Sequence, residues 1–108
     1  MQGTQVLWKE RTGKILVMFP FNQIKEGDKI VREFRGDVDP SELIWHQDRE
    51  DRLIKIIEAN GWGYQLDNQL PLPLEDGQEL FIPKMMYHRV IKGTGPLVVE
   101  VRMHEGSM

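Results

Sequence analysis

The stretch WHQDREDR, at 45–52, holds the residue types in this sequence that are best suited to chemistry. If the chain is extended there, its side chains alternate between two faces, and His46 and Asp48 project from the same face. An imidazole nitrogen and a carboxylate oxygen placed in this way begin a two-histidine, one-carboxylate metal site. Such a site leaves coordination positions open on Fe(II) or a similar divalent ion. His88, at the start of a later predicted strand, is the candidate for the third ligand.

The elements that must position these ligands are predicted to be strands. Stretches rich in β-branched and aromatic residues are separated by the turn signals EGD, DVDP, ANG, EDG and KGTG. This spacing predicts an all-β fold, an antiparallel sandwich or barrel. A helix is the alternative for 41–60, but the β-branched residues of 52–57 and the ANG that follows favour a strand. The predicted strands are 14–21, 28–34, 41–46, 52–57, 62–67, 78–83, 88–92 and 96–103.

Residues 43–103 resemble the cupin family. The second motif of that family runs Gly, five residues, Pro, one residue, Gly, two residues, His. The stretch GQELFIPKMMYH matches it at Gly77, Pro83 and His88, and has Met85 in place of the second glycine. The resemblance implies a cupin-like double-stranded β-helix, an antiparallel β-barrel. Residues 1–40 would then add the opening strands to a single domain, 1–108.

The first cupin motif is matched only in part. It runs His-x-His, three or four residues, Glu, then six or seven residues to a glycine turn. The stretch HQDREDRLIKIIEANG supplies His46, and has Asp48 at the second histidine position and Arg52 at the glutamate position. Arginine stays protonated at any working pH and cannot ligate a cation. The resemblance therefore implies either a three-ligand site of His46, Asp48 and His88 or a protein without a metal.

Three residues are candidates for binding a ligand beside that site: Arg52, Gln65 and Tyr87. If Arg52 points inward beside Asp48 it must be paired, because an isolated buried charge is too costly. It would either neutralise Asp48 in a metal-free pocket or bind the carboxylate or phosphate of a small molecule through its guanidinium fork. The plainer interpretations are exposed polar alternation for Gln65 and a core or rim position for Tyr87.

Composition excludes several kinds of partner. Lys and Arg number 14 against 17 Asp and Glu, and the net charge of −3 opposes binding to a phosphate backbone, so no nucleic acid is expected. The chain has no cysteine, which excludes disulfides and thiolate chemistry and suits a reducing compartment; we expect a cytoplasmic protein. Its apolar runs are too short to span a bilayer, and its start lacks the layout of a signal peptide, so no membrane partner is expected.

The sequence thus predicts a cupin-like protein that binds a small polar or anionic molecule. The expected cofactor is Fe(II), with Mn(II), Ni(II) or Zn(II) as alternatives, and catalysis would be that of an oxygenase or an isomerase/epimerase. No residue shows whether a reaction is catalysed. One alternative is a metal-free module that binds a sugar or small anion, and another is a structural homodimer. A homodimer is expected because an inward His46 turns Trp45 outward, where a large aromatic ring needs cover from the N-terminal strands or a second copy.

Overall fold

The computed structural model describes residues 7–9, 16–18 and 20–104. This part of the chain is nearly all β with antiparallel pairing, which confirms the predicted fold class. No helix within these ranges is long and apolar enough to cross a membrane. The elements are β1 (Leu7–Lys9), β2 (Leu16–Met18), β3 (Phe21–Glu26), β4 (Lys29–Phe34), the 3-10 helix η1 (Pro40–Glu42), β5 (Asp51–Glu58), β6 (Gly63–Leu66), β7 (Leu72–Pro73), β8 (Glu79–Ile82), β9 (His88–Ile91) and β10 (Leu97–His104).

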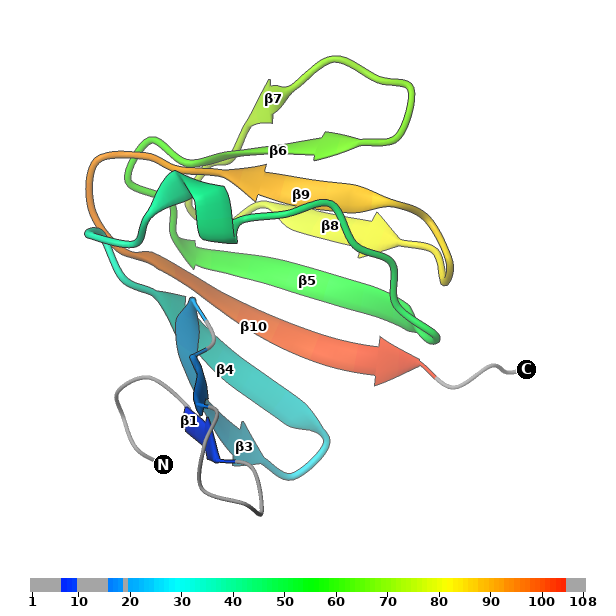
Figure 1. Cartoon of the computed structure of the whole chain (residues 1–108). Coiled ribbons are helices and arrows are strands. Elements are labelled where there is room, and N and C mark those ends of the chain that lie inside the picture. Colours follow the sequence, from blue (N-terminus) through cyan, green and yellow to red (C-terminus); the bar gives the residue numbers. More distant parts are fainter. Residues whose placement is uncertain (1–6, 10–15, 19, 105–108) are drawn as a thin grey trace.

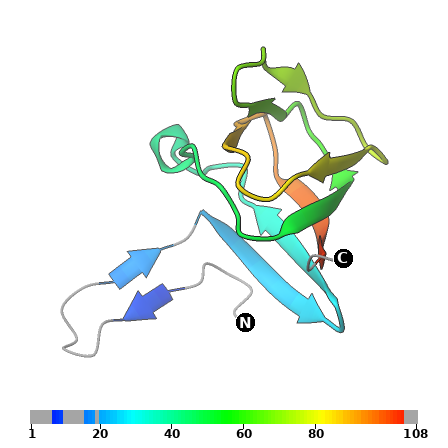
Figure 2. The same cartoon turned by 90° about the vertical axis from the view of Figure 1, so that its right-hand side faces the viewer.

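The described strands form two larger sheets and one separate pair (Figure 1). The first sheet has five strands in the order β3-β4-β10-β5-β8, and the second has three in the order β7-β6-β9. Their inner faces pack against each other, because one hydrophobic cluster contains residues of both sheets. The β1-β2 pair lies to one side of the two sheets (Figure 2).

Strand β5 shows how the period of two of a strand divides its side chains between an inner and an outer face. Ile56 is buried and Ile54 packs against the core, whereas Lys55 and Ile57 are exposed. Arg52 precedes them on the same inward ladder, because successive side chains of a strand point to opposite faces. The strand prediction for 52–57 is therefore confirmed, and the period of two brings a cation to the interior.

Trp62 stands at the centre of the core. Its side chain is fully buried, and its ring lies 5.6 Å from that of Phe34, centroid to centroid. The indole Nε1 donates a hydrogen bond of 2.6 Å to the carbonyl oxygen of Gly95. This residue therefore joins the start of β6 to the five-stranded sheet and to the turn before β10.

The prediction of a strand at 41–46 is wrong. The chain forms the 3-10 helix η1 at this place, and only His46 makes an isolated bridge, to His88. The cause is local: the side chain of Asp39 accepts a hydrogen bond from the Ser41 backbone N–H, and Pro40 holds a φ suited to a helical turn.

The predicted strand 14–21 is divided in two. Strand β2 ends at Met18, and β3 begins at Phe21 after Pro20, which has no backbone N–H to donate to a sheet. Residues 14, 15 and 19 of that prediction lie outside the described residues. Strand β3 continues to Glu26, through a segment for which no strand was predicted.

Met85, which stands at the second glycine position of the cupin motif, has a backbone conformation typical of glycine. Its φ is +65°, a left-handed conformation that favours glycine, and the motif glycine Gly77 has a φ of +84°. The Met85 N–H donates to the carbonyl oxygen of Asp48, at 2.7 Å, so this turn is tied to the predicted site. A methionine here adopts a backbone conformation that favours glycine, at a cost in backbone strain.

We expect Met85→Gly to leave the free energy of unfolding unchanged or to raise it by up to ~1 kcal/mol. Relief of the left-handed strain, about 1–2 kcal/mol, is offset by the larger chain entropy of glycine, about 0.5–1 kcal/mol. The matched control is Lys84→Gly, whose φ is not positive and which should lose about 0.5–1 kcal/mol. Urea unfolding measures the free energy of unfolding of both variants. An equal decrease in Met85→Gly and Lys84→Gly would show that Met85 is not strained.

Candidate metal centre

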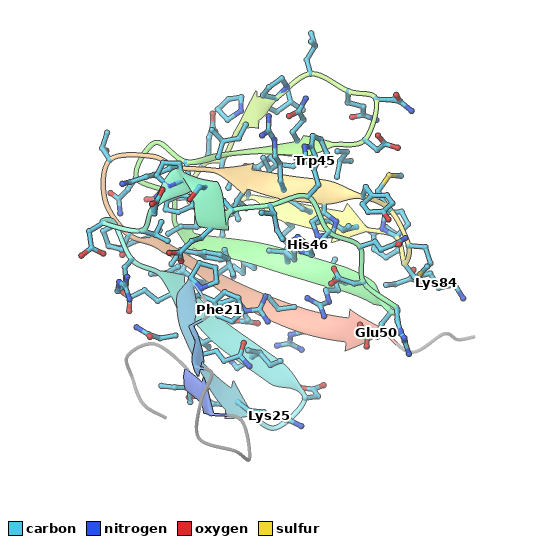
Figure 3. The ribbon with its side chains drawn as sticks, viewed as in Figure 1. Phe21, Lys25, Trp45, His46, Glu50 and Lys84 are labelled. Carbon is cyan, nitrogen blue, oxygen red and sulfur yellow. The ribbon has the colours of Figure 1, made fainter. Side chains whose placement is uncertain are left out.

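Two segments far apart in the sequence lie side by side at the candidate site. The backbone N–H of His46 donates to the carbonyl oxygen of His88 at 3.0 Å, and the N–H of His88 donates to the carbonyl oxygen of His46 at 2.9 Å. Their rings lie 4.2 Å apart, centroid to centroid. Figure 3 shows His46 and Trp45 on the segment that passes alongside β9. The bridge therefore supplies the convergence that a strand at 41–46 was predicted to give.

Both imidazoles are oriented by a backbone carbonyl group. His88 Nδ1 lies 2.7 Å from the carbonyl oxygen of Met86, and His46 Nδ1 lies 3.2 Å from that of Ile44. A carbonyl oxygen can only accept a hydrogen bond, so Nδ1 carries the proton in each neutral ring. The lone pair is then on Nε2 in both residues, which is the arrangement found in histidines that ligate metals.

The Asp48 carboxylate faces one of these lone pairs. Its Oδ2 lies 3.3 Å from His88 Nε2, is buried, and accepts no hydrogen bond from the described part of the chain. Two acceptor atoms at that distance repel unless a cation or a proton lies between them. The other oxygen, Oδ1, lies 3.5 Å from Arg52 Nη1. The arginine therefore holds one side of the carboxylate and leaves the other side open to a cation.

The donor set fits a divalent ion. One ligand atom from each of His46, Asp48 and His88 lies within 4.8 Å of the others. An ion with bonds of about 2.1 Å needs neighbouring donors roughly 3 Å apart, so small rotations of the side chains complete the site. Three protein donors on one side leave the remaining positions of a six-coordinate ion open.

The electrostatics of the site favour the ligating forms of His46 and Asp48. Burial lowers the pKa of His46 below its usual 6.5 and outweighs the opposing hydrogen bond to the Ile44 carbonyl group. Burial alone would raise the pKa of Asp48, but a hydrogen bond from His88, made when its Nε2 carries a proton, and the charge of Arg52 together hold this pKa below its usual 3.8. At neutral pH the first residue is a neutral imidazole and the second a carboxylate.

These shifts predict that the metal-free protein loses stability as the pH falls. Below pH 6.5 the unfolded chain binds a proton at His46 that the folded chain resists, and below pH 3.8 the same holds for Asp48. We expect the free energy of unfolding, from denaturant titrations at a series of pH values, to begin to decrease near pH 6.5. The decrease should be smaller in His46→Gln; an unchanged or steeper decrease in that variant would contradict the assignment.

The three residues open onto a cavity of about 450 Å³ between the two sheets. His88 is buried, whereas His46 is exposed. The walls are mainly aliphatic and aromatic, and this volume is typical of small-molecule sites, which span about 300–1,000 Å³. The apolar lining residues include Phe21, Phe34, Leu43, Ile54, Ile56, Leu74, Leu80, Ile82, Val90 and Val101.

Of the three residues predicted to bind a ligand, one lines the cavity and two do not. Arg52 lines the cavity and is paired with Asp48 and with Glu50, whose Oε1 lies 3.4 Å from Arg52 Nη2. Gln65 is not part of the lining, because the alternation of β6 turns Tyr64 inward and Gln65 to the opposite face. Tyr87 is also outside the lining, and its side chain is 47% exposed.

Two arginines of the cavity were missed by the sequence reasoning. Arg32 lines the cavity from β4, and Arg89 lines it from β9 with its guanidinium 4.9 Å from the centre of the Trp45 ring. The sequence did contain a signal for the first, because Arg32 alternates with Ile30 and Phe34 on an otherwise apolar ladder. The ring of Trp45 is 39% exposed, so Arg89 gives it part of the cover for which a homodimer was expected. The homodimer stays a prediction.

The sequence matches no protein-family model and no curated protein. Solved structures do resemble the fold. A cupin-2 domain protein from Shewanella frigidimarina is 17% identical, with a TM-score of 0.56 over 75% of this chain and 76% of that chain. A structure of the DMSP lyases RdDddP and RnDddQII is 24% identical, with a TM-score of 0.61 over 73% of this chain. Fe(II) HppE is 13% identical, with a TM-score of 0.60 over 95% of this chain.

The chain spans only 38% of the lyase chain and 57% of the HppE chain, so these likenesses concern one part of each enzyme. They share with the present structure a similar fold rather than a closely related sequence. Two facing sheets, the cupin spacing from Gly77 to His88 and the likeness to a cupin-2 domain protein agree with one another. The chain therefore has the fold of a small cupin domain.

Proposed function

We propose that this protein is a metal-dependent cupin in which His46, Asp48 and His88 bind one divalent ion beside a small-molecule cavity. The observation that carries the proposal is the buried Asp48 Oδ2, which has no hydrogen-bond donor in the described part of the chain and faces the Nε2 of His88 at 3.3 Å. A cation between them converts a repulsive contact into two coordinate bonds.

The residues around the three ligands have distinct roles in this proposal. The carbonyl groups of Ile44 and Met86 hold the protons of the imidazoles on Nδ1, which fixes ring orientation and the ligating tautomer. Arg52 neutralises and orients the carboxylate from its Oδ1 side. A divalent ion held by three protein donors would supply Lewis acidity or a redox centre to a molecule in the cavity.

We propose Fe(II) as the ion, with Mn(II), Ni(II) or Zn(II) as alternatives. Two histidines and one carboxylate with open positions are the ligand set of non-haem Fe(II) oxygenases. The similar fold of HppE, which was solved with Fe(II), supports the same choice.

The proposed reaction is that of an oxygenase, with an isomerase or epimerase as the alternative. We place the protein in the cytoplasm, because a chain without cysteine suits a reducing compartment.

The proposal is tested by metal analysis of protein purified without a polyhistidine tag and reconstituted with Fe(II) under anaerobic conditions. We expect about one ion per chain in the parent protein, and at least a tenfold loss of affinity in Asp48→Asn, which keeps the shape of the side chain but removes its charge. The matched control is Asp37→Asn, an exposed residue paired with Arg35 and outside the cavity lining, which should bind as the parent does. Equal metal binding by the three proteins would contradict the proposal.

A metal-free cupin that binds a small anion is the second candidate. It is favoured by the ion pair between Arg52 and Asp48, which balances the carboxylate charge without a metal. In that case a proton would lie between Asp48 Oδ2 and His88 Nε2. Thermal stabilisation by organic anions, with no stoichiometric metal at neutral pH, would favour this candidate.

A further inference from the structure

We infer that the cavity binds an organic anion with a hydrocarbon body, and that Arg32 binds its anionic group. The inference rests on the proposed function for the position of the ligand, since both concern the same cavity. It names a different residue from the Arg52 that the sequence suggested, and it favours a hydrocarbon body over the sugar that was one of the expected ligands.

Arg32 is held in a fixed orientation on the inner face of β4. Its Nε donates a hydrogen bond of 3.0 Å to Gln23 Oε1, and its guanidinium carbon lies 4.0 Å from the centre of the Phe21 ring. The neighbours of Arg32 on the same ladder, Ile30 and Phe34, are buried. A guanidinium held in this way loses little side-chain entropy when it binds a ligand.

Within the described part of the chain, the side chain of Arg32 donates its one hydrogen bond through Nε, and its two Nη groups make none. No carboxylate in those residues forms an ion pair with this arginine either, although Arg52, Lys29, Arg35 and Arg102 are all paired. Because Nε already donates to Gln23, the edge of the guanidinium formed by the two Nη groups is the one available to a ligand. That edge can donate two parallel hydrogen bonds to the two oxygens of a carboxylate or phosphonate.

Charge in the cavity favours an anionic ligand. Burial and the nearby positive charge of Arg52 lower the pKa of Arg32 to about 10, although the charge of Asp48 opposes this shift. Arg32 therefore remains protonated at neutral pH, with Asp48 near enough to act on its charge but not in an ion pair with it. The remaining carboxylate on the lining, that of Glu42, is exposed. An anion bound by Arg32 would stabilise its charged form.

The walls of the cavity define the rest of the ligand. The five-stranded sheet contributes Ile54, Ile56 and Val101, and the three-stranded sheet contributes Tyr64 and Val90. Among these side chains only Tyr64 carries a hydrogen-bonding group, so the hydroxyl groups of a sugar placed against them would lose water without gaining partners. A hydrocarbon body gains free energy from the same walls.

Isothermal titration calorimetry with hexanoate, acetate, hexan-1-ol and glucose separates charge from hydrocarbon body. In the metal-free and the Mn(II)-loaded parent protein, we expect hexanoate to bind at least tenfold more tightly than acetate or hexan-1-ol, and glucose not to bind. Arg32→Met should weaken hexanoate at least tenfold and leave hexan-1-ol unchanged, while Arg32→Lys should lie between. The matched control is Arg102→Met on the adjacent strand β10, outside the lining of this cavity, and it should bind hexanoate as the parent does.

Several outcomes would overturn the inference. They are binding of hexan-1-ol or glucose as tight as that of hexanoate, equal effects of Arg32→Met and Arg102→Met, or no binding of hexanoate by the parent protein. Comparison of hexanoate with hexan-1-ol in the parent requires no variant, so the test holds even where Arg32→Met fails to fold.

Metal content is measured on the same samples, so that failure of this inference and failure of the proposed function can be told apart. A fully occupied metal site without hexanoate binding overturns this inference alone. Arg32-dependent binding in a chain that takes up no metal contradicts the proposed function alone.

Discussion

Replacing His88 with alanine is expected to weaken binding of a divalent ion by more than about 100-fold, beyond the 10–100-fold typical of losing a residue that only supports a ligand. His88 offers its Nε2 lone pair from a buried, oriented ring, and no other histidine ring contacts that of His46 in the described part of the chain. Its loss leaves one imidazole and one carboxylate to hold the ion.

Competition titration with a fluorescent chelator measures this effect. The control is Lys84→Ala, an exposed residue in the same turn before β9, which should keep the affinity of the parent protein. His88→Ala should also abolish the stabilisation that added metal gives in thermal unfolding, since a ligand stabilises only the state that binds it. Retention of both properties in His88→Ala would place the metal elsewhere.

The largest effect on stability is expected for Trp62→Ala, at about 3–5 kcal/mol. The side chain is 0% exposed, so its removal leaves a cavity between the two sheets. It also leaves the carbonyl oxygen of Gly95 without the donor that now lies 2.6 Å away. Urea unfolding followed by circular dichroism measures the loss without depending on tryptophan fluorescence.

Trp45→Ala is the matched control for this prediction. Its ring is 39% exposed and contacts the guanidinium of Arg89, an interaction of about 0.5–1 kcal/mol at an exposed site. We expect a loss well below that of Trp62→Ala. Similar losses for the two tryptophans would mean that the core does not centre on Trp62.

The sequence predicted the strand at 52–57 because β-branched content and a following turn signal are local properties. The residues 52–57 alternate on β5, and the burial of Ile56 and exposure of Ile57 follow from a period of two. The start of the chain was harder to divide into strands. A continuous apolar run before Pro20 conceals the boundary between β2 and β3, and the polar residues of β3 give little strand signal.

The candidate site was predicted from residue types and a family spacing, and for an incorrect local reason. His46 and Asp48 were expected to converge with His88 because 41–46 would be a strand. The structure instead brings them together through one isolated bridge and the Met85–Asp48 hydrogen bond. Such contacts join residues far apart in sequence, so local pattern cannot reveal them.

Arg32 shows a different limit. Its place on the inner ladder of β4 can be deduced from alternation with Ile30 and Phe34. Its pairing with Gln23 and Phe21 depends on the register between β3 and β4, which the sequence does not state. The presence in the cavity of an arginine with no ion pair to a described carboxylate is therefore a property of the assembled sheet.

The central claim is most directly tested by an anomalous-difference map from crystals grown with Mn(II), a redox-stable substitute for Fe(II). We predict a single strong peak about 2.0–2.2 Å from His46 Nε2, His88 Nε2 and the Oδ2 side of the Asp48 carboxylate, with Arg52 still on the Oδ1 side. The absence of a peak among these three side chains, or a peak bound by other residues, would contradict the claim.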